Sequence, residues 1–224
     1  MKNAVVIVAG GSGVRMGGNV PKQYMDLQGK PLLIHTMEKF LSYDPAMKII
    51  LVLASGHRKF WDVISLSYPY VKNVEVATGG LSRFESVKNG LQIIEDGVVV
   101  GIHDAVRPFV NHLTIKRCYA TARKEGSAIP VIEMDESVRM IKSGGRSSQL
   151  DRSTLRRIQT PQVFQSALIK KAYQQQKDHN FTDDGSVYES VFGHVSLVEG
   201  NRENIKITTP VDLEFAKLLM DPGQ

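Results

Sequence analysis

Short apolar runs alternate with stretches of helical periodicity over the first 125 residues. Residues 5–9 are continuously apolar, which is typical of a strand covered on both faces. Residues 31–43 carry Leu, Met and Phe at the spacing of one helix face. This alternation predicts an α/β fold with a mostly parallel sheet and helical crossovers. The expected strands are 5–9, 48–54, 74–77 and 98–103, and the expected helices are 31–43, 58–66, 82–94 and 112–125.

Two of these helices begin with capping signals. Ser82 is followed three residues later by Glu85, which is the capping-box spacing. Asn111 can accept a hydrogen bond from the first turn of the helix expected at 112–125. These side chains set the expected helix starts.

The pattern changes after residue 128. Residues 129–132, 137–141 and 147–151 are expected strands with no helical stretch between them, and Ser143-Gly-Gly145 joins the last two. They predict a β-arm at about 133–157 that protrudes from a single domain spanning 1–224. The remaining expected elements are a helix at 165–177, a strand at 195–198 and a helix at 210–219.

Composition excludes several classes of protein. The 28 Lys and Arg against 23 Asp and Glu give a net charge of +5, which alone does not separate a nucleic-acid binder from an ordinary basic surface. The single cysteine, Cys118, excludes an internal disulfide framework, and the histidines lack metal-ligand spacing. No apolar run approaches the ~18 residues of a membrane span. We therefore expect a cytoplasmic protein with no membrane partner.

The densest chemical signal follows the first expected strand. Ala9-Gly-Gly-Ser-Gly-Val-Arg-Met16 is a glycine loop whose exposed N–H groups can approach a phosphate. No stretch of the chain fits the Walker A pattern, and Met16 stands where the dinucleotide fingerprint needs a third small residue. A nicotinamide-dependent oxidoreductase is therefore disfavoured.

Two cations accompany this loop. Arg15 lies within it, and Lys22 follows in Pro21-Lys-Gln-Tyr24, where the proline restricts the direction of the backbone. Two positive charges beside exposed N–H groups suit a ligand with several negative charges, such as a triphosphate.

The glycine loop and the Pro-Lys-Gln-Tyr motif resemble those of the small cytidylyltransferases of the non-mevalonate isoprenoid route, which act on 2-C-methyl-D-erythritol 4-phosphate. Further blocks match in order along nearly the whole chain, and their combination is far more specific than any one block. These blocks are Gly79-Gly80 with Arg83 and Ser86-Val87, His103-Asp-Ala-Val-Arg-Pro108, Asp151-Arg152, Gln159-Thr-Pro-Gln162 with Phe164, Phe181-Thr-Asp-Asp184, and Val198-Glu-Gly-Asn201 with Asn204-Ile-Lys206.

The resemblance implies a Rossmann-like nucleotidyltransferase fold and a homodimer in which the arm completes the neighbouring site. It also implies that CTP and a polyol phosphate give a CDP-polyol and pyrophosphate, with Mg²⁺ held mainly by the CTP phosphates rather than by protein ligands.

The resemblance also implies roles for individual residues. Arg15 and Lys22 would grip the triphosphate and stabilise the transition state, and Arg152 and Lys206 would position the acceptor phosphate for attack. The implied nucleotide contacts are Ala9, Gly10, Gly11, Gly13, Gly79, Gly80, Ser86 and Asp104. The implied acceptor contacts are Asp104, Arg107, Ser137, Arg152, Thr182 and Lys206.

Three positions depart from the family pattern: Gly10 and Ser186 replace alanines, and the segment leading to Ser137 is longer than usual. For Asp104 two readings stand side by side, one in which it contacts Mg²⁺ or the ribose and one in which it pairs with Arg107. His103 is expected to be structural, and one of the two aspartates 183–184 is expected to cap a helix.

Two other functions stay open from the sequence. A cytidylyltransferase for another polyol phosphate, such as ribitol 5-phosphate, would share the glycine loop and lysine motif, and the acceptor-side residues favour the first substrate. A non-catalytic basic nucleic-acid binder would instead need cations interleaved with aromatic residues, whereas the aromatic content is only 7%. We therefore expect no nucleic-acid partner.

Overall fold

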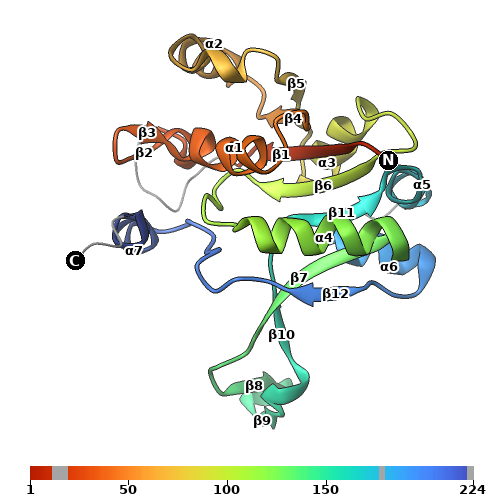
Figure 1. The fold of residues 1–224 in the computed structure, drawn as a ribbon. Helices are drawn as coiled ribbons and strands as arrows, with labels where there is room; N and C mark the ends of the chain where they lie inside the picture. The colour runs from red at the N-terminus through yellow and green to blue at the C-terminus, as the bar shows by residue number, and fades with distance from the viewer. Residues whose placement is uncertain (12–19, 177–179, 221–224) are drawn as a thin grey trace.

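The computed structural model describes residues 1–11, 20–176 and 180–220. An eight-stranded sheet forms the middle layer, in the order β10-β7-β11-β6-β1-β4-β5 with β12 paired to β7 (Figure 1). The strands of this sheet are β1 Asn3–Ala9, β4 Lys48–Leu53, β5 Glu75–Thr78, β6 Val99–Asp104, β7 Ser127–Glu133, β10 Arg156–Ile158, β11 Gln162–Gln165 and β12 Leu197–Glu199. Two small sheets have two strands each. One pairs β2 Asp26–Leu27 with β3 Lys30–Pro31, and the other pairs β8 Val138–Ile141 with β9 Ser147–Leu150. The helices are α1 Leu32–Tyr43, α2 Arg58–Ser67, α3 Arg83–Gln92, α4 His112–Glu125, α5 Ser166–Gln175, α6 Asp184–Phe192 and α7 Pro210–Met220.

The N-terminal half forms the parallel part of the sheet. β1 pairs in parallel with β4 on one side and with β6 on the other, and β4 pairs in parallel with β5. The chain runs from β1 outward to β5 and then returns past β1 to β6. The carboxyl ends of β1 and β6 therefore flank a topological switch point, which is where open α/β sheets bind ligands.

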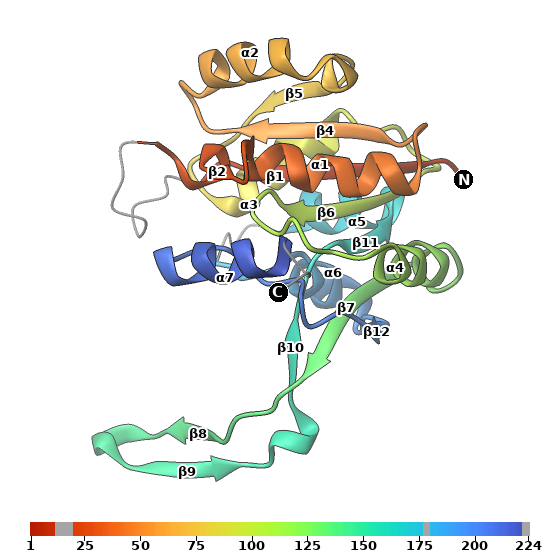
Figure 2. The same ribbon diagram turned by 60° about the vertical axis from the view of Figure 1, so that its left-hand side comes forward.

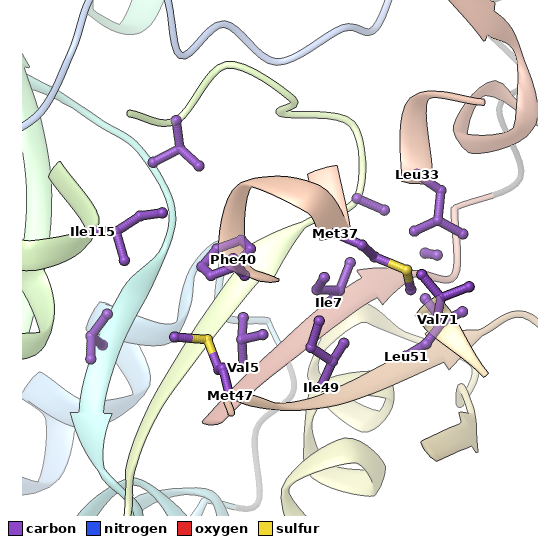
Figure 3. Close-up of a cluster of buried hydrophobic side chains, with 14 of the residues drawn as sticks. Val5, Ile7, Leu33, Met37, Phe40, Met47, Ile49, Leu51, Val71 and Ile115 are labelled. Carbon is purple, nitrogen blue, oxygen red and sulfur yellow. The ribbon is translucent and has the colours of Figure 1, made fainter. Parts of the chain in front are cut away.

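Alternation along β1 supplies both faces of the core. Val5 and Ile7 pack with α1, α2 and α4, whereas Ala4 and Val6 pack with α3, α5 and α6. Figure 3 shows the first of these clusters, with Phe40 and Met37 of α1 lying over the sheet. A strand buried on both faces must be apolar throughout, which explains the unbroken run at residues 5–9.

The predicted helix starts are confirmed. Ser82 is the N-cap of α3, and its Oγ accepts a hydrogen bond from the Glu85 N–H at 3.1 Å. Asn111 caps α4 in the same way through the Thr114 N–H at 2.7 Å. These signals are local in sequence, so they were readable before the fold was known.

The second half of the sheet is antiparallel around β11. β11 pairs with β6 and β7, and β10 pairs with β7. Beyond β7 and β10 the chain continues into the β8–β9 hairpin, which projects away from the layered body (Figure 2). Residues 138–157 hold six Lys or Arg and one Asp, so the rest of the chain carries equal numbers of both signs.

Two strands of this half were not predicted from the sequence, and α6 was indicated only by the cap expected at one of the aspartates 183–184. α6 begins at Asp184, and β10 and β11 are short strands at Arg156–Ile158 and Gln162–Gln165. The strands pair with segments elsewhere in the sheet, and α6 has only weak amphipathic periodicity, so no local pattern gives the extent of these elements.

A glycine in α3 gives a stability prediction. A Cβ at Gly90 would lie 2.6 Å from Val6 Cγ1 and 2.8 Å from Val52 Cγ2. We expect Gly90→Ala to lower the free energy of unfolding by about 1–2 kcal/mol, because overpacking outweighs the gain in helix propensity. Urea unfolding would measure this, with Gln92→Ala at an exposed position of α3 as the control. A more stable Gly90→Ala protein would contradict the close packing of α3 on the sheet.

Candidate active site

A cleft of about 240 Å³ opens at the switch point between β1 and β6. Its wall combines the end of β1, the turn before α3, the end of β6 and the segment before α7. The described residues that line it are Val8, Ala9, Gly10, Gly11, Lys22, Gln23, Gly80, Leu81, Ser82, Arg83, Ser86, Asp104, Ala105, Val106 and Lys206.

The backbone after β1 is held by a buried amide. Gln23 Nε2 donates to the Ala9 carbonyl at 2.8 Å and approaches the Gly11 carbonyl at 3.4 Å. Gln23 lies beside Lys22 in a single 3-10 turn, Lys22–Tyr24. A Cβ on Gly11 would lie 3.7 Å from Lys22 Cε, so the lysine stem passes close over the glycine backbone. One short motif therefore supplies the cation and fixes the loop beside it.

The second glycine pair lies opposite, before α3. The Gly80 N–H donates to Ser86 Oγ at 3.1 Å, and Ser86 Oγ donates to the Ser82 carbonyl at 2.9 Å. A Cβ on Gly79 would lie 2.8 Å from Ser86 Oγ and 3.2 Å from the Leu53 carbonyl oxygen. Glycine is required here because the backbone approaches both neighbours closely.

Asp104 is the centre of charge in the cleft. Its Oδ2 accepts from Arg107 Nε at 3.1 Å and lies 3.1 Å from Lys206 Nζ. Arg107 Nη1 also donates to the Asn204 carbonyl at 2.8 Å. Of the two readings left open for Asp104, the structure shows the pairing with Arg107, and it adds Lys206 as a second partner.

The surroundings of Asp104 keep it ionised. Burial by itself raises the pKa of this carboxyl group, but the positive charges of Lys206, Arg83 and Arg107 lower it more. The pKa therefore lies well below its usual range, and the carboxylate stays negative at every pH at which the protein would work.

His103 contacts the backbone and side chains next to Asp104, as expected of a structural histidine. Thr160 Oγ1 accepts from the Asp104 N–H at 3.1 Å and lies 3.0 Å from His103 Nδ1. The Thr160 hydroxyl can therefore donate to Nδ1, which leaves the hydrogen on Nε2 to donate to the Arg107 carbonyl at 3.1 Å. This chain of hydrogen bonds fixes the backbone on both sides of the Asp104–Arg107 pair.

The structure brings together much of the predicted site, but not all of it. Ala9, Gly10, Gly11, Lys22, Gly80, Ser86, Asp104 and Lys206 all line the cleft, with Gly79 and Arg107 in contact with lining residues. Gly13 and Arg15 lie outside the described residues. Ser137, Arg152 and Thr182 are exposed and do not line this cleft.

The three exposed residues occupy two places. Ser137 and Arg152 belong to the arm, where Arg152 Nη1 donates to the Asp135 carbonyl at 2.6 Å. Thr182 immediately precedes Asp183, the N-cap of α6. Asp183 Oδ1 accepts from the Ser186 N–H at 3.3 Å and contacts the Ser186 hydroxyl, so the capping expectation for one of the two aspartates is confirmed.

Sequence reasoning assigned no role to several side chains that build the site. Gln23 and Thr160 act on backbone atoms of the two strand ends. Gln159 Nε2 donates to the Asn201 carbonyl at 2.8 Å, and Asn204 Nδ2 donates to the Thr160 carbonyl at 2.8 Å. These bonds hold the segment that leads to Lys206. All four residues stand in motifs, which was the available signal, but their partners are known only from the fold.

Comparison with known proteins agrees with this geometry. The family model of 2-C-methyl-D-erythritol 4-phosphate cytidylyltransferase matches residues 3–222. The chain belongs to this family.

Relatives of the same name cover the full chain. The cytidylyltransferase of Phocaeicola vulgatus is 46% identical over 220 residues, which are 98% of this chain and 100% of the relative. That of Bacillus velezensis is 38% identical over 223 residues, covering 98% and 96% of the two chains. The family assignment therefore does not depend on a single segment.

Solved structures of the family share the fold. The 4-diphosphocytidyl-2C-methyl-D-erythritol synthase of Anaerococcus prevotii superposes with a TM-score of 0.84 at 27% identity, covering 98% and 96% of the two chains. The cytidylyltransferase of Thermus thermophilus gives 0.79 at 28% identity, covering 98% of each chain. The predicted Rossmann-like nucleotidyltransferase fold is confirmed.

The described part of this cytidylyltransferase family member contains neither a cluster of metal-ligating side chains nor a helix that could span a membrane. Within residues 1–11, 20–176 and 180–220 there is no group of three or more His, Cys, Asp or Glu side chains that could hold a metal ion. No helix in the same ranges is long and apolar enough to cross a membrane.

The buried His103 leads to a prediction for how the stability of the protein depends on pH. Burial lowers the pKa of His103 to about 4, from the usual 6.5 of a histidine. Between these values the unfolded chain binds a proton that the folded chain does not, so the free energy of unfolding falls as pH drops from about 6.5 towards 4. We expect His103→Gln to reduce this slope in urea unfolding measured at several pH values.

The control for His103→Gln is the same substitution at His194, which is exposed. Parallel stability profiles for wild type and His103→Gln would show that His103 does not stay neutral in the folded protein.

Proposed function

We propose that the chain transfers the cytidylyl group of CTP to 2-C-methyl-D-erythritol 4-phosphate, giving 4-diphosphocytidyl-2-C-methyl-D-erythritol and pyrophosphate. The observation that carries this proposal is the cleft itself. Glycine backbone from two strand ends, the side chain of Lys22, and Lys206 of the Asp104 cluster all line one cleft. Full-length membership of the cytidylyltransferase family supports the choice of both substrates.

The reaction needs positioning more than acid–base chemistry. A phosphate oxygen of the acceptor attacks the α-phosphorus of CTP in line, and pyrophosphate leaves. The nucleophile is already anionic, so no general base is required. The barrier lies in bringing two polyanions together and stabilising the charge of the transition state, for which preorganised cations are suited.

Magnitudes explain why several cations are needed. A unit-charge pair 4 Å apart is worth about 4 kcal/mol at an effective dielectric of ~20. CTP and the acceptor phosphate together carry several negative charges, so one or two cations cannot offset their repulsion. Arg15, Lys22, Arg152 and Lys206 are the four cations that we assign to this task.

On the nucleotide side, the glycine loops receive CTP. We assign Ala9, Gly10, Gly11 and Gly13 of the first loop, and Gly79, Gly80 and Ser86 of the second, to contacts with the nucleotide. Backbone N–H groups recognise a base edge or a phosphate only where no side chain intervenes, which suits the close packing around Gly79. Lys22 and Arg15 then hold the triphosphate and stabilise its transition state.

On the acceptor side, Asp104 orders two cations. Its carboxylate holds Arg107 and Lys206 at the rim of the cleft, and we assign all three residues to the acceptor. Thr182, Ser137 and Arg152 belong to the same set of assigned contacts. When the acceptor phosphate binds, Lys206 is positioned to exchange its pairing with Asp104 for the phosphate.

Arg152 implies a second subunit. It lies on the arm, and the arm projects away from its own layered body (Figure 2). We propose a cytoplasmic homodimer in which the arm of each subunit carries Arg152 to the acceptor side of the partner site. The excess of cations in residues 138–157 supports this role, since a polyphosphate site attracts positive charge.

Mg²⁺ fits this cleft as a ligand of the substrate. Asp104 is the only carboxylate among the described lining residues, and its Oδ2 is already bonded to Arg107 and Lys206. We propose that Mg²⁺ is held mainly by the CTP phosphates, as Mg²⁺ often is in nucleotide sites. When bound, it neutralises phosphate charge and favours departure of pyrophosphate.

The alternatives fit less well. A nucleic-acid binder would interleave cations with aromatic side chains, and the basic segment 138–157 contains no aromatic residue. A ribitol 5-phosphate cytidylyltransferase would use the same nucleotide loops, but the full-length relatives carry the methylerythritol phosphate name.

Pyrophosphate release tests the proposed function directly. With CTP and Mg²⁺, we expect turnover with 2-C-methyl-D-erythritol 4-phosphate and little with ribitol 5-phosphate. Lys22→Ala should lower kcat by roughly 10²–10³, the cost of losing one preorganised donor. Lys59→Ala, at an exposed position of α2, is the control. Turnover of ribitol 5-phosphate alone would overturn the choice of acceptor, and near-normal turnover by Lys22→Ala would overturn the role of Lys22.

Subunit mixing tests the arm. Arg152→Ala and Lys206→Ala should each be nearly inactive. If Arg152 acts on the partner site, a mixed dimer has one intact site and one site that lacks both cations. Equal mixing with subunit exchange should then restore about a quarter of wild-type activity, as the symmetry of a two-fold dimer requires. No recovery in dimers shown to have exchanged subunits would mean that Arg152 serves its own subunit or none.

A further inference from the structure

An ion pair between a half-buried arginine and a fully buried aspartate joins the two halves of the site. Arg83, the first residue of α3, donates from Nη1 to Asp184 Oδ1 at 2.8 Å and from Nη2 to Asp184 Oδ2 at 2.6 Å. Asp184, the first residue of α6, is fully buried and also accepts from the Tyr173 hydroxyl at 2.6 Å. The carboxylate therefore has three short charge-assisted hydrogen bonds.

Stability does not explain why this pair is present. Taking a carboxylate and a guanidinium out of water costs about as much as their attraction returns, and well-packed apolar side chains often do as well. A bidentate pair does fix the relative position of the elements that carry it, because both hydrogen bonds must keep their geometry at once. The position of α3 relative to α6 is thus what this pair determines.

The α3 end of the pair belongs to the second glycine loop, residues 79–82, which we call the nucleotide loop. Arg83 lines the cleft directly after Ser82. Ser86 Oγ bonds both the Ser82 carbonyl and the Gly80 N–H, so this turn and the first turn of α3 form one hydrogen-bonded unit. A shift of Arg83 would carry this unit with it.

The α6 end of the pair belongs to residues 182–185, which we call the acceptor segment because Thr182 is assigned to the acceptor. Gln162 of β11 donates from Nε2 to Asp183 Oδ2 at 2.9 Å and accepts from the Gly185 N–H at 2.7 Å. Thr182 precedes these residues directly, so its position follows that of the α6 start. The two units come from segments about a hundred residues apart, and the Arg83–Asp184 pair connects them.

Arg83 also acts on the centre of the cleft through its charge. After Lys206, it is the positive group that lowers the pKa of Asp104 most. The Arg83 guanidinium therefore has three connections. It is hydrogen-bonded to Asp184 of the acceptor segment, it follows the nucleotide loop directly in the chain, and its charge acts on the Asp104 carboxylate.

We infer that Arg83 and Asp184 are positioning residues that set the nucleotide loop and the acceptor segment at a fixed relative geometry, so that binding of both substrates depends on the pair. This inference rests on the proposed function, which assigns CTP to the glycine loops and the acceptor to the Thr182 side. A small misplacement of one substrate against the other is enough to slow an in-line transfer strongly.

Separate KM values test the inference. In Arg83→Lys, which keeps the charge but loses the bidentate geometry, we expect the KM for CTP and the KM for the methylerythritol phosphate each to rise about tenfold, with a further fall in kcat. Asp184→Asn should raise the same two constants. Lys170 lies on neighbouring α5 and pairs with Asp96 of the turn before β6, so Lys170→Gln is the control and should leave both KM values unchanged.

Two more variants separate a positioning effect from a loss of folding. Arg83→Gln combined with Asp184→Asn leaves no unpaired buried charge, and its effect should be no larger than that of Arg83→Gln alone, because the two residues act as one unit. Tyr173→Phe keeps the ion pair while removing one hydrogen bond to Asp184, and should raise both KM values by a smaller factor. Circular dichroism and the melting temperature of each variant show that it is folded.

Three outcomes would overturn the inference. A rise in the KM for CTP alone would show that Arg83 serves only the nucleotide loop. Additive effects of the two single substitutions would show that they act independently. Folded variants with lowered Tm but unchanged KM values would show a purely structural role. Failure of the proposed function is distinguishable from all three, because wild-type protein would then release no pyrophosphate with this acceptor.

Discussion

The carboxylate of Asp104 lies at the carboxyl end of a central strand, largely removed from water, and its negative charge has to be balanced there. The groups that balance it come from three parts of the chain, two of them distant: Arg83 from the start of α3, Arg107 from the turn directly after β6, and Lys206 from the segment before α7. These three cations together balance the buried charge of Asp104. The need to balance that charge in the folded protein therefore also brings the cations of the cleft together. An anionic substrate then meets side chains that are already in place.

Neutral hydrogen bonds hold the remaining parts of the site. Gln23 fastens the loop after β1, Ser86 closes the turn before α3, and Thr160 links the backbone of Asp104 to His103. None of these groups changes its charge, so the backbone around the cleft keeps its shape while charged ligands come and go. Lys206 has the most exposed side chain of the Asp104 pairs, at 39%, and is the group best placed to change partners.

The sequence was informative where the determinants are local. The unbroken apolar run at residues 5–9, the caps Ser82 and Asn111, and the glycine loop all depend on neighbours within a few residues. The cap of α6 was expected at one of the aspartates 183–184, but the extent of the helix was missed because its periodicity is weak and because Gln162 and Arg83 contact it only after folding. The same limit applies to Gln23 and Thr160, whose motifs were visible but whose backbone partners were not. The arm was predicted as a hairpin from its own pattern, whereas its target in the proposed dimer depends on a second subunit.

A crystal structure with CTP and Mg²⁺ bound tests the central claim most directly, namely that one cleft at the β1–β6 switch point assembles both substrates around the Asp104 cluster. We expect the base and ribose against Gly10, Gly79 and Ser86, the triphosphate within hydrogen-bond distance of Lys22, and the α-phosphate facing Lys206. A nucleotide bound elsewhere, or one whose α-phosphate points away from Lys206, would contradict this account.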